Sequence, residues 1–123
     1  MPSIASLLVT LAIAPTGVWS GSSALAPEVS MTLQGGKIVE ATAWTSVFSC
    51  ELGGNIGPAS VTVRPSARIG SGGRISFTAG RRSRKMAARL RYSKGKISGK
   101  IRVSGSIGGP CSSPTIPVLL RKR

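Results

Sequence analysis

Apolar and polar residues alternate with a period of two along most of this chain, the spacing of a β-strand with one buried face. After the first 26 residues, no stretch repeats its apolar residues at the three- and four-residue spacing of an amphipathic helix. The 123 residues include 16 Gly and 8 Pro, and many of them fall between the alternating runs as turn signals. The pattern predicts one all-β domain, an antiparallel β-sandwich of about seven short strands.

The predicted strands are bounded by glycine, proline or polar loops. Gly35-Gly36 should turn the chain after the first strand, and bulges are expected near Val39 and Trp44, where the alternation of the second strand slips. Pro117 has no backbone N–H, so the last strand should lie at an edge or pair on one side only there. The predicted strands are residues 29–33, 37–50, 61–63, 74–79, 86–92, 96–104 and 115–120.

Turn length sets which side chains face each other across the two C-terminal hairpins. A two-residue turn at Lys94-Gly95 sets apolar residues opposite apolar ones, with Tyr92 facing Ile97, whereas a three-residue loop would reverse the parity. The same turn sets Arg89 opposite Lys100. A six-residue loop, 80–85, gives the preceding hairpin a matching register.

Three consecutive strands therefore form a meander with one apolar and one basic face. Arg74 should face Arg91, and Arg89 should face Lys100, and such like-charge pairs are destabilising. Either dissolved salt screens this face or an anionic ligand occupies it. The candidate polyanion-binding residues, including the cations of the 80–85 loop as a mobile rim, are Arg74, Arg81, Arg82, Arg84, Lys85, Arg89, Arg91, Lys96, Lys100 and Arg102.

Charge and composition restrict the chemistry. Seventeen Lys and Arg oppose three Glu, with no Asp and no His, for a net charge of +14 and a pI near 11.8. A Ser-His-Asp triad and a Cys-His pair are impossible without histidine. Zinc ligand spacing is missing, and a two-carboxylate site would require Glu40 and Glu51 to converge. We therefore expect a non-enzymatic protein without metal or cofactor, although so basic a surface can also be a simple solvated one.

The N-terminus has the pattern of a secretory signal peptide. Residues 4–14 form an apolar segment too short to span a bilayer, and small residues follow it. Cleavage after Ala24 or after Ala26 divides the chain into a signal peptide, 1–26, and a single domain, 27–123. The alternatives are an uncleaved anchor and a mis-set start codon. Export predicts a Cys50–Cys111 disulfide, which would stabilise the fold by roughly 4 kcal/mol because it closes a long loop.

Aromatic residues bear on the nucleic-acid alternative. Single-strand binders stack bases on exposed aromatic side chains. Phe77 and Tyr92 fall on the apolar face in the predicted register, and Trp44 and Phe48 are assigned to the core. A basic face without aromatics could still hold phosphates through arginine, without sequence preference and with steep salt dependence.

Four features recur between residues 30 and 123: an early Cys, the strand Gly73-Arg74-Ile75-Ser76-Phe77 after a glycine turn, the basic run from Lys96 to Val103, and a Cys before a final basic strand. With these features the segment resembles a loose group of uncharacterised small secreted bacterial β-sandwich proteins. It implies a β-sandwich with a terminal disulfide and no particular activity.

The leading interpretation is a secreted or envelope-associated monomeric domain, without a transmembrane anchor after processing. Its basic meander would bind polyanionic envelope material or an acidic protein. One alternative is an intracellular nucleic-acid-binding β-barrel with a mis-set N-terminus, and another is a secreted inhibitor-like protein that presents a loop.

Overall fold

The computed structural model describes residues 14–55, 57–106 and 108–123, and most of them lie in antiparallel strands. The pairing order is β5-β4-β11-β10-β12-β1-β2-β3-β6, with β9 and then β8 on the other side of β10 and β7 beside β3. The strands are β1 Gly17–Gly21, β2 Glu28–Gln34, β3 Lys37–Thr45, β4 Ser49–Cys50, β5 Gly54–Asn55, β6 Ala59–Val63, β7 Ala67–Arg68, β8 Arg74–Arg81, β9 Arg84–Ser93, β10 Lys96–Ser106, β11 Pro110–Ser112 and β12 Ile116–Lys122.

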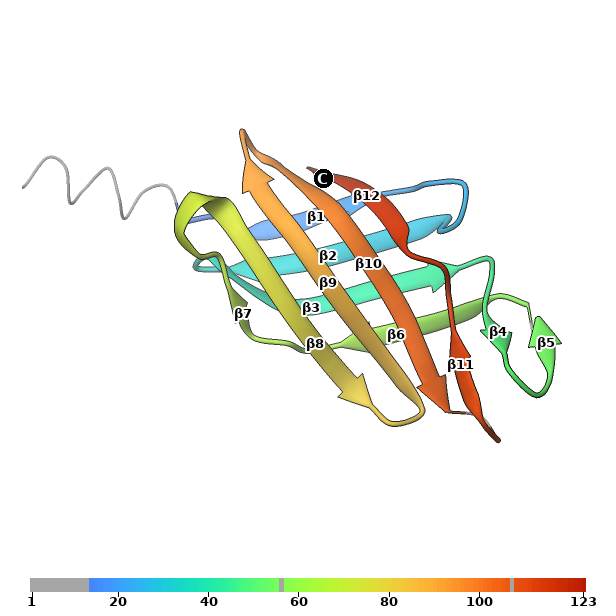
Figure 1. Ribbon diagram of the computed structural model, residues 1–123. Helices are drawn as coiled ribbons and strands as arrows, with labels where there is room; N and C mark the ends of the chain where they lie inside the picture. The colour runs from blue at the N-terminus through green and yellow to red at the C-terminus, as the bar shows by residue number, and fades with distance from the viewer. Residues whose placement is uncertain (1–13, 56, 107) are drawn as a thin grey trace, which may run out of the picture.

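One curled sheet forms both layers of the domain. In Figure 1, β1, β2, β3 and β6 form the rear layer, and β8, β9, β10 and β12 cross in front of it. The predicted all-β antiparallel class is confirmed. The expected seven strands become twelve, because short pieces such as β4, β5 and β7 also pair.

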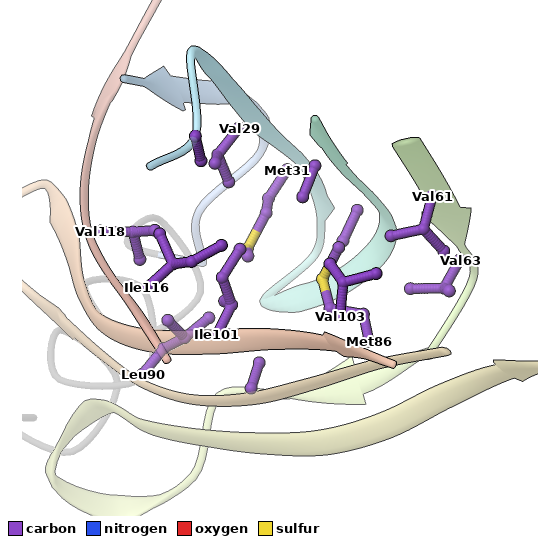
Figure 2. Packing of buried hydrophobic residues seen from close by; sticks show 14 of the residues in the cluster. Val29, Met31, Val61, Val63, Met86, Leu90, Ile101, Val103, Ile116 and Val118 are labelled. Carbon is purple, nitrogen blue, oxygen red and sulfur yellow. The ribbon is translucent and has the colours of Figure 1, made fainter. Parts of the chain in front are cut away.

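The core fills the space between the two layers. Inward positions alternate along every long strand, as in β9, where Met86, Ala88 and Leu90 are buried while their neighbours are exposed. Figure 2 shows Val29 and Met31 from the rear layer packed toward Ile101 and Ile116 from the front layer. No buried side-chain polar atom in the described ranges lacks a hydrogen-bond partner.

The strand predicted over residues 37–50 divides into two. β3 ends at Thr45, whose buried hydroxyl donates to the carbonyl of Val47 at 2.9 Å and stabilises the turn there. Phe48 then enters the core, and the chain continues into β4. The bulge expected near Val39 is confirmed, because the register of β2 and β3 shifts there. The one expected near Trp44 is wrong, because β3 pairs regularly with β6 at that point.

Trp44 explains this error. Its side chain is 44% exposed on the outer side of β3, whereas the sequence interpretation assigned it to the core. Phe48 is fully buried, and Phe77 and Tyr92 pack against the core as predicted. With Trp44 facing outward, Ala43 and Thr45 face inward in an unbroken alternation.

Both C-terminal hairpins have the predicted register. Across Lys94-Gly95, Tyr92 pairs with Ile97 and Arg89 with Lys100. Lys94 and Gly95 have φ values of 54° and 76°, as a two-residue type I′ turn requires. The turn between β8 and β9 is shorter than predicted, because Arg81 already pairs with Arg84.

A predicted disulfide joins Cys50 to Cys111. The two residues are direct cross-strand partners on β4 and β11, and 61 positions separate them in the sequence. The bond attaches the short β4–β5 hairpin to the front layer. Within the described ranges, no helix is long and apolar enough to cross a membrane.

Replacing both Cys50 and Cys111 with Ala should lower the free energy of unfolding by about 4 kcal/mol, because the unfolded chain regains the entropy of a long open loop. Urea denaturation of the variant and of the oxidised and reduced parent protein measures this. A variant as stable as the oxidised parent would contradict a structural role for the bond.

Replacing Gly99 with Asn should destabilise the domain by about 2 kcal/mol or more, because its φ of 148° excludes side chains. An added Cβ would also lie 2.2 Å from the Arg89 carbonyl oxygen. The matched control is Gly35→Asn, where φ is 56° and nothing lies within 4 Å of an added Cβ. Thermal denaturation should show a lower Tm for Gly99→Asn alone, and an equal loss in both variants would contradict the steric argument.

Candidate anion-binding surface

The ten candidate polyanion-binding residues lie on β8, β9, β10 and the turn between β8 and β9. Nine of them are exposed, and Arg84 is half-buried. Alternation places seven of the nine on the outer side of the front layer, because the residues between them supply the core. These seven are Arg74, Lys85, Arg89, Arg91, Lys96, Lys100 and Arg102.

Cross-strand pairing brings like charges together. Arg74 lies opposite Arg91, and Arg89 lies opposite Lys100, as the predicted registers require. Side chains in such positions have Cβ atoms about 5 Å apart, so their charges repel. Lys85 has the same outward parity at the far end of β9.

The last strand adds a cation that the sequence did not assign to the surface. β12 pairs with β10 from Ile101↔Ile116 to Lys96↔Arg121, which places the exposed Arg121 beside Lys96. Sequence reasoning predicted this strand but not its neighbour, because a pairing between strands that no hairpin joins has no local signal. Pro117 has β10 as its partner and lies outside the short β1–β12 pairing, so it pairs on one side as expected.

We call these cations the basic outer face; they are Arg74, Lys85, Arg89, Arg91, Lys96, Lys100, Arg102 and Arg121. The protein has three carboxylate side chains for all of its cations. Glu40 lies 3.6 Å from Arg64 and Glu28 lies 4.0 Å from Arg123, both outside the basic outer face. Among the described residues, no ion pair involves a member of this face.

Small residues between the cations leave two shallow depressions. The first has a volume of about 440 Å³, and its lining includes Arg74, Arg91 and Ser98. The second has a volume of about 560 Å³, and its lining includes Thr78, Ala87 and Lys100. Ser76 and Arg89 line both, so the two depressions adjoin. Together they form a shallow basic groove across β8, β9 and β10.

The cations repeat at the period of the strands. Outward residues along one strand lie about 7 Å apart, since each residue adds about 3.3 Å. The register sets Lys96 in the first row, Arg91 in the second, Arg89 with Lys100 in the third, and Arg102 in the fourth. The basic outer face therefore offers at least one positive charge per row over about 20 Å, and the groove covers the second to fourth of these rows.

Arg102 is held in place by its neighbours. Its Nε donates to the carbonyl oxygen of Ser113 at 3.3 Å, and its Nη2 donates to the Ser112 hydroxyl at 3.2 Å. Its remaining N–H groups stay available to an anion, because a guanidinium has five. Holding the side chain in advance lowers the entropy lost when it binds.

Arg84 stands apart from the other candidates. It has inward parity on β9, its guanidinium lies 5.0 Å from the Phe48 ring centroid, and its Nη1 donates to the Ser60 carbonyl at 3.3 Å. These contacts join β9 to β6, the edge strand of the rear layer. The rim of Arg81 to Lys85 is also less open than expected, because strand pairing reduces the connection to Arg82-Ser83.

The described residues give little support for a two-carboxylate catalytic site or a metal site. Glu40 is paired with Arg64 on the rear layer, while Glu51 follows β4 on the disulfide-linked hairpin. The described part of the chain contains no group of three His, Cys, Asp or Glu that could hold a metal ion.

Comparison with protein-family models, curated proteins and solved structures finds no match to this chain. The fold and the surface define its class by themselves: a small disulfide-bonded all-β domain with one basic outer face. No activity is carried over from a relative.

Replacing Arg89 with Gln should raise the free energy of unfolding by a few tenths of a kcal/mol at low ionic strength, because its repulsion with Lys100 disappears. The gain should vanish near 1 M salt, where the screening length is about 3 Å. Arg82→Gln, in the exposed turn, is the control that removes the same charge away from such a pair. Denaturation curves at both salt concentrations measure the effect, and equal gains in both variants would contradict a local repulsion.

Proposed function

We propose that this protein is a secreted, non-enzymatic domain whose basic outer face binds a linear polyanion of the cell envelope. The observation that carries the proposal is the pair of adjoining depressions, walled by cations that face one another and have no carboxylate partner among the described residues. A bound anion would remove the repulsion that the empty face bears.

The shape of the surface favours an extended ligand. The groove is shallow and open, and its charges follow one another over several rows of the sheet. A small anion would contact one or two of these cations, whereas a chain with a charge on each repeat could contact every row. Phe77 and Tyr92 pack against the core, and the exposed Trp44 lies on β3 of the rear layer, away from the basic outer face. Stacking of bases therefore has less support here than contacts with phosphate or carboxylate.

The disulfide supports a location outside the cytosol. Such bonds persist in oxidising compartments and are rare where thiols are kept reduced. The apolar N-terminal segment of residues 4–14 supports export independently, and it lies almost wholly outside the described residues.

Neutralising Arg89, Arg91 and Lys100 together with Gln should abolish most salt-sensitive retention on a phosphocellulose column, because these cations occupy the middle of the groove. Each of the three lost contacts would otherwise release about 0.7 counterions. The slope of log affinity against log salt concentration should therefore become shallower by about 2. Elution by a salt gradient, followed by titration against soluble polyphosphate, measures both quantities.

The matched control removes three charges that lie outside the basic outer face: Lys37, Arg64 and Arg68, each changed to Gln. Net charge falls equally in both triple variants, so a located site predicts a much smaller effect in the control. Equal losses would contradict the groove and leave only general charge attraction. Tighter binding to single-stranded nucleic acid than to isolated envelope material would instead favour the nucleic-acid alternative.

A further inference from the structure

The N-terminal strand β1 occupies an interior position in the sheet. It pairs with β2 at five positions, from Gly17↔Leu33 to Gly21↔Val29, and with β12 at Trp19↔Lys122 and Ser20↔Arg121. In the pairing order, β1 is the link between β12 of the front layer and β2 of the rear layer. Figure 1 shows it beside both strands.

Trp19 anchors this strand in the core. Its side chain is 2% exposed, and its Nε1 donates to the Gly95 carbonyl oxygen at 3.0 Å. The Tyr92 ring meets it edge to face with centroids 6.0 Å apart, and Lys122 Nζ lies 5.6 Å from its ring centroid. The strand therefore contacts the turn that organises the basic hairpin and the end of β12.

Small residues flank Trp19 because the neighbouring backbone lies close. A Cβ at Gly21 would lie 2.3 Å from the Leu119 carbonyl oxygen, and one at Gly17 would lie 2.9 Å from Lys122 Cε. The segment Gly-Val-Trp-Ser-Gly thus fits a narrow slot with its one large side chain directed inward.

Contacts continue on both sides of β1. The Gly36 N–H donates to the Pro15 carbonyl at 3.1 Å, and the Gly35 N–H donates to the Thr16 hydroxyl at 3.1 Å. On the β12 side, the C-terminal residue Arg123 makes two contacts with β1. Its backbone N–H donates to the Val18 carbonyl at 2.9 Å, and its Nε donates to the Ser20 hydroxyl at 3.0 Å. Residues 15–21 therefore have hydrogen-bonded neighbours on both sides.

Cleavage after Ala24 or Ala26 lies on the C-terminal side of β1. Loss of residues 15–21 would expose the edges of both β2 and β12 and open the core where Trp19 sits. Open strand edges with a vacant apolar socket capture another extended segment, as in strand-addition complexes.

We propose that residues 15–21 are an obligatory strand of the mature domain, so that any cleavage of a leader falls before Pro15. The slot between β2 and β12 is then a binding site for one occupant, the segment of residues 15–21 of this chain. In a protein cut at residues 22–26, the slot holds that segment without a covalent bond and rebinds it as a separate peptide. This inference is independent of the polyanion proposal.

The test starts from the intact folded chain with a protease recognition sequence inserted directly after Ser22, which is exposed. After cutting, native mass spectrometry should show the two pieces still associated. A labelled peptide of residues 14–22 should then exchange into the slot. The same peptide with Trp19→Ala should bind at least a hundredfold more weakly, because it leaves the core socket empty. A Gly21→Val peptide should also bind weakly, because its side chain meets the Leu119 carbonyl.

A second measurement covers the case in which the cut protein precipitates. In the uncut chain, the Trp19→Phe substitution should increase the rate of backbone amide hydrogen exchange. The increase should come first at the edges of β2 and β12, and only afterwards in β8. The mature N-terminus of the exported protein, read by mass spectrometry, should lie at or before Pro15. A folded mature chain that begins at Leu25 or Pro27, or a cut protein that releases the segment while β2 and β12 keep their protection, would overturn the proposal.

Discussion

The two-residue turn at Lys94-Gly95 is the constraint on which most of the molecule depends. Its positive φ values set the register of β9 against β10, and a strand's side chains alternate, so that register decides which residues enter the core. The same turn accepts the hydrogen bond of Trp19, which ties β1 to the front layer. One short connection thus sets the apolar face, the basic face and the seat of the N-terminal strand.

The two faces of the front layer have opposite energetic roles. Inward residues such as Ile97, Ile101 and Val103 remove apolar surface from water and hold the sheet against the rear layer. Outward residues place Arg and Lys side by side and reduce that stability by repulsion. The disulfide and the buried core offset this repulsion, and the anion that we propose as a ligand would relieve it.

Prediction from sequence succeeded where neighbours along the chain decided the structure. The registers of both C-terminal hairpins, the bulge at Val39 and the Cys50–Cys111 bond follow from parity, turn length and an even cysteine count. It failed at Trp44, because an aromatic residue in a strand does not reveal which face it occupies. It also missed Arg121, because the β10–β12 pairing joins strands that no hairpin connects.

The sequence by itself determined an all-β chain with a basic meander, because alternation and turn residues act over a few positions. Tertiary structure alone decided that the sheet curls into one continuous body, that β12 widens the basic face, and that Gly17–Gly21 is an interior strand. The five-residue run around Trp19 looks like the tail of a leader when read in sequence. Its role appears once β2 and β12 come together, because a slot between two strands distant in sequence exists only in the folded molecule.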